Sequence, residues 1–265
     1  MTFDNFKFHY SFRGNRAKPL ILFLHGFMGD SNEFNEVISL LSDQFCSLTV
    51  DLPGHGKTRV LGDEECYMMS NTADAVINLL DQLNVKNCFL VGYSMGGRLA
   101  LYLNLHFPQY FSKVVLESAS PGLKTERDRL ERIHRDFALS KKLEKGNLST
   151  FLENWYNQPL FASLKNHPKF NFLIESRLHN NPCELAKSLR NLGLGCQPCL
   201  WENIKHNKNP WLLVVGEYDS KFIAINSEMA RLCQSITLEI VSSCGHNIHF
   251  EDPKTFVENV RLFFT

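Results

Sequence analysis

A serine enclosed by glycines is the residue in this 265-residue chain whose surroundings most strongly predict chemistry. The segment Gly92-Tyr93-Ser94-Met95-Gly96 follows an apolar run at 88–91 and precedes a run with helical spacing that starts at Arg98. A strand, a tight turn and a helix form the context in which Gly-x-Ser-x-Gly makes a nucleophile elbow. The glycines let the turn approach neighbouring backbone closely, so the serine projects from the end of a sheet. The pattern therefore predicts Ser94 as the reactive residue.

Two further polar residues follow predicted strands later in the chain. Asp219 comes shortly after the apolar run 211–215, and His246 comes shortly after the run 236–241. A serine is a weak nucleophile or base unless a histidine holds its proton and a carboxylate orients the imidazole. The chain order serine, acid, histidine is that of the α/β-hydrolase arrangement. We therefore predict a catalytic triad of Ser94, His246 and Asp219.

Other acids and bases lie near these positions. Glu217 and Asp252 are alternative acids, and His25 and His249 are alternative bases. Asp219 is favoured because it follows Gly-x-x at the end of a strand, and His246 is favoured because it follows Cys-Gly at a strand exit.

The loop after the buried run 20–24 supplies candidate hydrogen-bond donors. This loop reads His25-Gly26-Phe27-Met28-Gly29, and in folds of this kind it faces the elbow. The backbone N–H groups of Phe27 and Met95 are therefore predicted to form an oxyanion hole. A plain glycine turn capped by a histidine is the alternative interpretation.

Strands and helices alternate along most of the chain, which is typical of a parallel sheet covered on both faces. The alternation stops between 124 and 209, where charged helical stretches are separated by prolines. We predict an α/β-hydrolase fold with a mostly parallel central sheet, a core formed by 1–122 and 210–265, and a helical cap (lid) at 123–209. The predicted strands are 6–12, 20–24, 46–50, 88–91, 114–119, 211–215 and 236–241, and the predicted helices are 31–41, 71–83, 125–145, 148–156, 181–192 and 253–263.

Composition excludes several classes of partner. Lysine plus arginine equals aspartate plus glutamate at 28 each, so no general field attracts the chain to nucleic acid or to an anionic membrane. The N-terminal segment lacks the pattern of a signal peptide, and no apolar run approaches the length of a membrane span. Eight cysteines without framework spacing suit reduced thiols. We expect a cytoplasmic protein that is a monomer or a weak homo-oligomer.

Two patterns have the spacing of metal ligands but are weak evidence for a metal site. Cys196-x-x-Cys199 has no second cysteine or histidine pair beside it, and His246-x-x-His249 lacks the glutamate and the helix of a zinc protease motif. We therefore expect neither a metal nor a cofactor.

Five segments together resemble one family, the 2-succinyl-6-hydroxy-2,4-cyclohexadiene-1-carboxylate (SHCHC) synthases of menaquinone biosynthesis, known as MenH. They are distributed over the core and the predicted cap, so the resemblance covers nearly the whole chain. The segments are GYSMGGR at 92–98, ESASPGL at 117–123, WYNQPLF at 155–161, LGLGCQPCLW at 192–201 and GEYDSKF at 216–222. Cys196 and Cys199 depart from the small polar residues expected around Gln-Pro.

The resemblance implies a carbon–oxygen lyase. Its substrate would be 2-succinyl-5-enolpyruvyl-6-hydroxy-3-cyclohexene-1-carboxylate (SEPHCHC), from which it would eliminate pyruvate, with Ser94 of the triad acting as base. The family's carboxylate-binding arginines fall on Arg98, Arg132 and Arg177. Arginine suits this role, because its guanidinium binds carboxylates bidentately and stays charged.

The surroundings of these residues leave some choices open. Arg129 and Arg135 lie one turn on either side of Arg132 and are expected to be solvated on the surface. Tyr93, Trp155 and Phe161 are expected to wall the cavity. Two alternative functions remain: a serine carboxylesterase or carbon–carbon bond hydrolase that uses the same triad, and a non-catalytic hydrolase-like protein that binds a small ligand.

Overall fold

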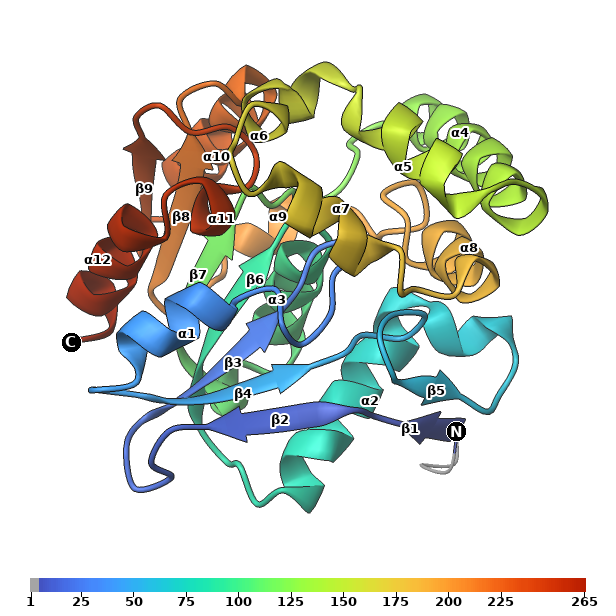
Figure 1. Ribbon diagram of the computed structural model, residues 1–265. Coiled ribbons are helices and arrows are strands. Elements are labelled where there is room, and N and C mark those ends of the chain that lie inside the picture. Colours follow the sequence, from blue (N-terminus) through green and yellow to red (C-terminus); the bar gives the residue numbers. More distant parts are fainter. Residues whose placement is uncertain (1–4) are drawn as a thin grey trace.

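A computed structural model describes residues 5–265, and its centre is a twisted seven-stranded sheet (Figure 1). The strand order is β2-β4-β3-β6-β7-β8-β9, and every neighbouring pair is parallel except β2 with β4. The predicted α/β-hydrolase fold class is confirmed. The strands are β2 (Tyr10–Arg13), β3 (Leu20–Leu24), β4 (Cys46–Val50), β6 (Cys88–Tyr93), β7 (Phe111–Glu117), β8 (Trp211–Gly216) and β9 (Ile236–Val241).

The predicted N-terminal strand is divided in two. β1 (Phe6–Lys7) pairs with β5 (Arg59–Val60) in a separate small sheet, and β2 joins the main sheet. The division falls at His9, whose backbone N–H donates to the Thr58 hydroxyl at 2.9 Å. The prediction that the chain lacks a signal peptide rests partly on residues 1–4, which lie outside the described residues.

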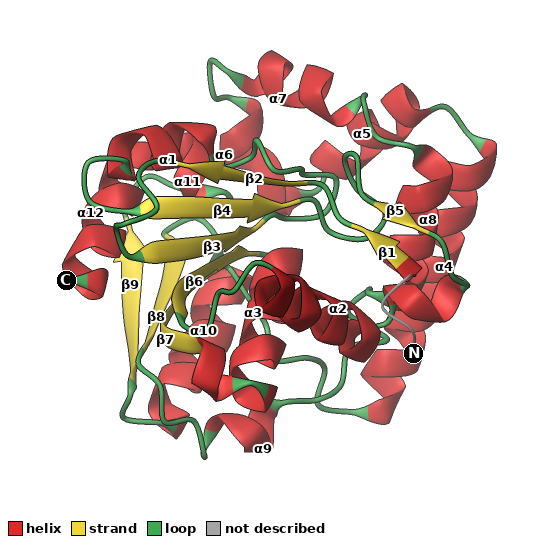
Figure 2. Cartoon of the chain, turned by 90° about the horizontal axis from the view of Figure 1, so that it is seen from below, coloured by secondary structure: helices red, strands yellow, loops and turns green. Residues whose placement is uncertain are grey.

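Helices cover both faces of the sheet (Figure 2). One face is covered by α2 (Met69–Gln82), α3 (Met95–His106) and α10 (Ser220–Leu232), and the other by α1 (Asn35–Leu41), α11 (Ile248–Glu251) and α12 (Pro253–Phe264). Each side has its own apolar core, because the side chains of each strand alternate between the two faces. Leu22 and Leu24 of β3 belong to one core, for example, and Ile21 and Phe23 to the other.

Residues 118–210, between β7 and β8, contain no strand and are called the insertion below. Its helices, all but the last (Trp201–Ile204), lie over the carboxyl edge of the sheet (Figure 1) and pack around a third apolar core; the last packs into the core on the α3 and α10 side of the sheet. They are α4 (Glu126–Lys145), α5 (Leu148–Tyr156), α6 (Ala162–Lys165), α7 (Phe170–Arg177), α8 (Pro182–Asn191) and α9 (Trp201–Ile204). Of these, α4, α5 and α8 match predicted helices. The pattern did not predict α7, whose apolar residues are spread around the helix, or α9, which is one turn long.

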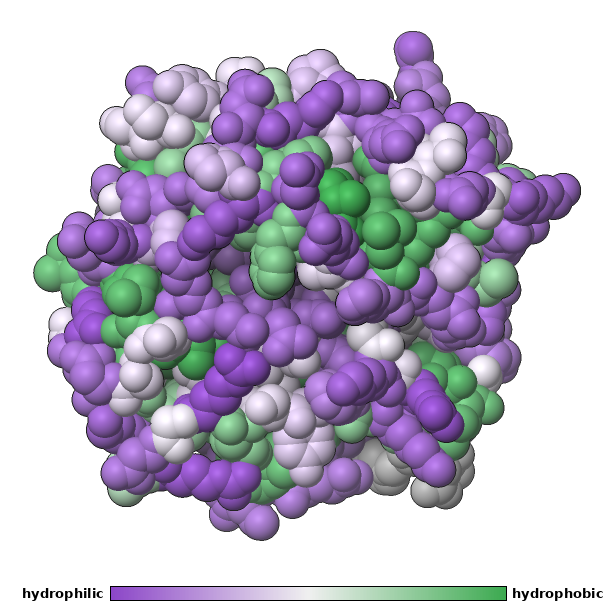
Figure 3. Space-filling model, in the orientation of Figure 1, coloured by the Kyte–Doolittle hydropathy of each residue, from purple (hydrophilic) through white to green (hydrophobic). Residues whose placement is uncertain are grey.

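The outer surface is mostly hydrophilic. Figure 3 shows polar residues over most of one face, broken by separate apolar areas, one of which lies over the helices of the insertion. Within residues 5–265, no helix is both long and apolar enough to cross a membrane.

Candidate active site

The turn between β6 and α3 holds Ser94 in a backbone conformation that few residues adopt. Its φ is 48° and its ψ is −104°, and its N–H donates to the Glu117 carbonyl of β7 at 2.9 Å. A Cβ at position 92 would lie 2.5 Å from the Gly96 carbonyl oxygen, and one at position 96 would overlap the Leu24 carbonyl. Glycine is therefore required at both positions, and the surrounding backbone fixes the strained serine at the sheet edge.

The three residues of the predicted triad meet at this edge. His246 Nε2 lies 2.9 Å from Ser94 Oγ, and His246 Nδ1 lies 2.6 Å from Asp219 Oδ2. Asp219 follows β8 and His246 follows β9, and both are at most 3% exposed. The carboxylate fixes the imidazole so that Nδ1 carries a proton and Nε2 can accept one from Ser94. This geometry can activate the serine as a base or as a nucleophile.

The alternative acids and bases have other partners. His249 Nδ1 lies 2.6 Å from Glu117 Oε2, and His25 Nε2 accepts from the Leu52 N–H at 2.9 Å. Glu217 accepts from the Ser243 N–H, and Asp252 accepts from the Thr255 N–H at the start of α12. Three of these side chains bind backbone N–H groups and His249 binds Glu117, and none of the four is bonded to Ser94 within the described residues.

Phe27 and Met95, whose N–H groups are predicted to form an oxyanion hole, lie beside the serine. Both residues line the same cavity as Ser94 and His246, and neither N–H donates a hydrogen bond within residues 5–265. The adjacent Gly26 N–H donates to Glu33 Oε2 at 3.0 Å, which holds the loop in place. Two unused donors beside the serine could bind an oxygen that gains negative charge.

The cavity in front of the serine lies between the sheet edge and the insertion. Its volume is about 160 Å³. Four basic residues line it, and within the described residues no aspartate or glutamate does. The basic residues are Arg98, Arg132, Arg135 and Lys221, and the apolar walls are Phe27, Met95, Leu139, Trp155, Leu160, Phe161, Leu189, Leu192, Leu194 and Phe222.

Arg98 is held in the cavity by uncharged groups. Its Nη1 donates to the Leu192 carbonyl and to Gln197 Oε1, both at 3.0 Å. Burial and the nearby charge of Arg132 lower the pKa of Arg98 to about 10, so it stays protonated at neutral pH. Burial and the same Arg132 charge also lower the pKa of Lys221. Burial is the larger cause of both shifts. Arg132 is itself paired with the buried Asp136 at 2.7 Å, whereas Arg98, Arg135 and Lys221 have no carboxylate within ion-pair distance in residues 5–265.

The predicted substrate-binding residues divide into two groups. Arg98, Arg132, Trp155 and Phe161 line the cavity, whereas Tyr93 and Arg177 do not. Tyr93 is buried, and its ring centroid lies 5.5 Å from that of His246.

Arg177 is 4% exposed and forms an ion pair with Glu33. Burial would lower its pKa, but the Glu33 charge more than offsets this and the pKa of Arg177 is raised. A buried carboxylate therefore already satisfies this guanidinium, and Arg177 touches the site only through Glu33, which holds the Gly26 N–H of the oxyanion loop.

Some residues that line the cavity were not predicted. Arg135 was expected to be solvated, yet it lines the cavity. Arg129, which is equally spaced from Arg132 on the other side, does not line it, so spacing alone does not separate the two. Lys221 and Ser118 also line it. Each lies just after the end of a parallel strand, and that position is the sequence signal that could have identified them.

Comparisons with known proteins place this site in a family. The alpha/beta hydrolase fold family model matches residues 19–253. A protein from Escherichia coli O1:K1 / APEC named 2-succinyl-6-hydroxy-2,4-cyclohexadiene-1-carboxylate synthase is 34% identical over 240 residues, covering 91% of each chain. A Bacillus subtilis (strain 168) protein that carries this name provisionally is 36% identical over 264 residues, covering 99% of this chain and 96% of the relative.

A solved structure gives the same result. MenH from S. aureus superposes with a TM-score of 0.92, is 36% identical and covers 97% of both chains. The likeness extends through the insertion as well as the core, since so little of either chain is left out. The chain therefore belongs to the α/β-hydrolase fold family and, within it, to the 2-succinyl-6-hydroxy-2,4-cyclohexadiene-1-carboxylate synthase (MenH) family.

Proposed function

We propose that this chain is a carbon–oxygen lyase of menaquinone biosynthesis that eliminates pyruvate from SEPHCHC to give SHCHC. The observation that carries the proposal is the cavity beside Ser94, which four basic residues and no carboxylate line within the described residues. The substrate has three carboxylates, on the ring, the succinyl group and the enolpyruvyl group. Arg132 is already paired with Asp136, but a simple ester would leave Arg98, Arg135 and Lys221 without a counter-charge in a partly desolvated site.

The chemistry follows from the positions of the double bonds. The substrate is a 3-ene with the leaving group on C5, and the product is a 2,4-diene, so the proton must leave C2, next to the succinyl ketone. The C2–H electrons form the C2–C3 double bond, the former C3–C4 pair moves to C4–C5, and the C5–O bond breaks. The enolpyruvate released takes a proton to become pyruvate.

The residues around Ser94 suit this elimination. His246 accepts the hydroxyl proton, and Ser94 Oγ then removes the proton from C2. Negative charge develops on the ketone oxygen as the proton leaves, and the N–H groups of Phe27 and Met95 stabilise it. The proton held on His246 is available to the departing enolpyruvate. Ser94 thereby acts as a base without forming an acyl intermediate.

The basic residues hold the three carboxylates while this happens. Arg98 enters the cavity from the first turns of α3, Arg132 and Arg135 from α4, and Lys221 from α10. Guanidinium groups in a site shielded from water bind carboxylates more strongly than in bulk solvent. Arg177 has a positioning role in this proposal, because it fixes Glu33 beneath the oxyanion loop.

The proposal includes the organisation of the chain. Residues 1–122 and 210–265 form the catalytic core and 123–209 the cap that closes the cavity. All eight cysteines are free thiols in the structure, which supports a reducing compartment, the cytoplasm. We propose a monomer or weak homo-oligomer, with the small polycarboxylate as the ligand.

The decisive measurement is pyruvate release from SEPHCHC generated in situ, with wild-type protein beside Ser94→Ala. We expect release well above a no-enzyme control for the wild type, and a loss of about 1,000-fold or more for Ser94→Ala, because the variant has no group at the position of the base.

Release at the control rate together with Ser94-dependent cleavage of activated esters would instead establish a hydrolase. Ligand binding without turnover, unchanged in Ser94→Ala, would establish a binding protein.

A further inference from the structure

A second cleft lies between α4 and α5, at the outer edge of the insertion. The two helices are neighbours in the chain and pack against each other (Figure 1). The cleft has a volume of about 710 Å³ and is more open than the catalytic cavity. It is large enough for a drug-sized molecule, for which pockets of roughly 300–1,000 Å³ are usual.

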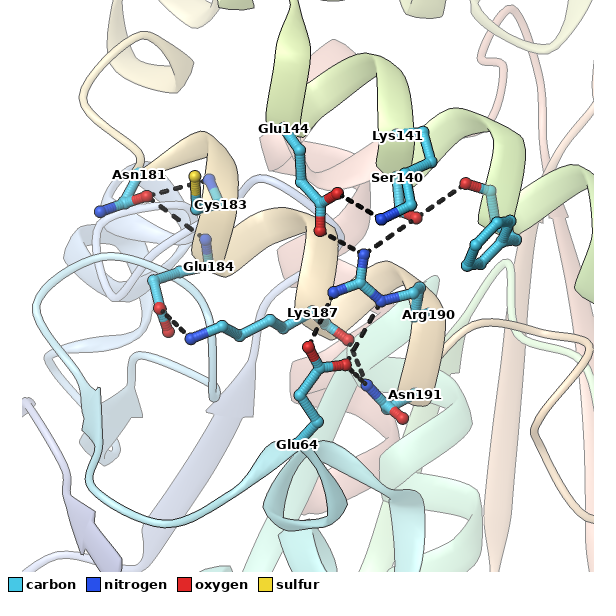
Figure 4. A network of polar contacts seen from close by, with 11 residues as sticks. Glu64, Ser140, Lys141, Glu144, Asn181, Cys183, Glu184, Lys187, Arg190 and Asn191 are labelled. Atoms are coloured by element: carbon cyan, nitrogen blue, oxygen red, sulfur yellow. Dashed lines mark hydrogen bonds and ion pairs between the residues drawn. The ribbon is translucent and has the colours of Figure 1, made fainter.

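The charges around this cleft have one sign. Arg135, Lys141, Lys142 and Lys145 line it, and no aspartate or glutamate does within the described residues. Lys141 is paired with Glu144 at 2.8 Å, and Glu144 also binds Arg190 of α8 (Figure 4). Across residues 5–265, Lys142 and Lys145 have no carboxylate within ion-pair distance. The C-terminal dipole of α4 compensates only about half a unit charge, so the cleft keeps a net positive potential.

The cleft and the catalytic cavity share a wall. Arg135, Leu139, Trp155 and Gln158 line both, and Arg135 Nη2 donates to Gln158 Oε1 at 3.2 Å across this wall. The cleft therefore lies next to the cavity beside Ser94 and is separated from it by these side chains.

Three positive residues lie on one face of α4, with Leu139 between the second and the third. Arg132, Arg135, Leu139 and Lys142 are spaced three, four and three positions apart, which puts them on one face of the helix. At 1.5 Å per residue this face carries charge over about 15 Å, from the cavity to the cleft. A molecule with several carboxylates could release Lys142 with one carboxylate after it has bound Arg135 or Arg132 with another, and so move along this face towards Ser94.

We propose that the α4–α5 cleft is an anion-binding vestibule, in which Lys142 and Lys145 capture a small polycarboxylate and pass it along α4 to the catalytic cavity. This inference rests on the proposed function for the identity of the polycarboxylate. Clefts lined by one sign of charge raise the local concentration of the opposite ion and its rate of association. Capture in the vestibule acts before the chemical step, so it affects kcat/KM and leaves kcat alone.

The test is the double variant Lys142→Glu/Lys145→Glu, assayed for pyruvate release from SEPHCHC over a range of sodium chloride concentrations. The matched control is Lys86→Glu/Lys254→Glu, which makes the same change in net charge at exposed positions outside both cavities. We expect kcat/KM of the vestibule variant to fall about tenfold at low salt, with kcat unchanged. The difference from the wild type should shrink as salt screens the charges. The control should match the wild type.

Three outcomes would overturn the vestibule. One is equal kcat/KM for the vestibule variant and the control. Another is a loss that does not depend on salt. A third is a fall in kcat with a lowered Tm, which would show that the lysines stabilise α4. A wild-type protein that releases no pyruvate would instead refute the proposed function, so the two failures are distinguishable.

Discussion

Two regions of the molecule use arginine in opposite ways. At the seam between α4, α8 and the 3-10 turn Glu64–Tyr67, Arg190 is paired with Glu144 of α4 and with Glu64 of the core (Figure 4). At the cavity, Arg98 is bonded only to uncharged oxygens. The pKa of Glu144 is lowered to about 2 by hydrogen bonds from Lys141 and Arg190, whereas the pKa of Arg98 is lowered by burial and a neighbouring cation. Arg190 thus holds parts of the fold together, whereas Arg98, which has no carboxylate partner, is available to a ligand.

The largest effect on stability is expected at the buried pair of Glu33 and Arg177. Like Arg190, Arg177 is an arginine paired with a carboxylate. Glu33→Gln leaves the Arg177 guanidinium without a charge partner in the core. Breaking a buried ion pair on one side costs about 3–5 kcal/mol. Thermal unfolding should therefore show a marked fall in Tm relative to the wild type. An unchanged Tm would mean that Arg177 finds another partner.

The same variant has an expected pH dependence. Burial raises the pKa of Glu33, but Arg177 and the nearby His249 and His25 more than offset this and hold it below its usual value. A depressed carboxyl pKa contributes stability that is present above the unfolded pKa, near 4.5, and lost as pH falls through the folded value. The Tm gap between wild type and Glu33→Gln should therefore stay constant near neutral pH and narrow below about pH 4.5. A gap that widens in acid would contradict this assignment.

Arg98→Ala tests the unpaired arginine. Loss of a charged donor to a substrate carboxylate should cost about 2–5 kcal/mol of transition-state binding, a fall in kcat/KM of roughly 30-fold or more. Its Tm should fall by less than that of Glu33→Gln, since the Leu192 carbonyl and Gln197 lose a hydrogen-bond donor but no buried carboxylate loses its partner. Arg98→Lys is the matched control and should recover part of the activity. Unchanged kinetics in Arg98→Ala would remove this residue from the site.

The smallest effect is expected at the seam. Arg190→Ala removes partners from Glu64 and Glu144, but the Glu64 side chain is 50% exposed and water replaces part of the interaction. The loss of stability should be about 1 kcal/mol and should decrease with added salt. Steady-state kinetics on SEPHCHC should not change. A large fall in kcat with an unchanged Tm would contradict the division into structural and ligand-binding arginines.

The sequence predicted the core of this molecule better than the position of each arginine. Ser94, Asp219 and His246 could be identified because each follows a strand of a parallel sheet, and such strand ends meet at one edge. The family assignment was confirmed by relatives that match over nearly the whole chain. The apolar runs also predicted the strands of the main sheet. They did not predict the break at His9, which depends on a hydrogen bond to Thr58, 49 positions away.

The arginines were harder because a helix exposes more than one face. Arg135 and Arg177 are both basic residues on helices of the insertion, yet one lines the cavity and the other is buried against Glu33. Which occurs depends on how α4 and α7 pack over the core, and no local pattern encodes that packing. Glu33 lies 144 positions before Arg177, so nothing in the surrounding sequence marks the pair.

The point at which the insertion leaves the sheet has a consequence for chain entropy. It departs after Glu117 of β7 and returns at Trp211 of β8, and these strands are adjacent, with Glu117 opposite Val214. The two ends are thus only about 10 Å apart, since three residues of strand and one strand spacing separate them. The entropic cost of closing a loop grows with the logarithm of its length, about 0.6 kcal/mol for each doubling. The entropic cost of closing a long helical insertion at this position is therefore little more than that of a short connection. Its length can change over evolution without disturbing the triad beneath it.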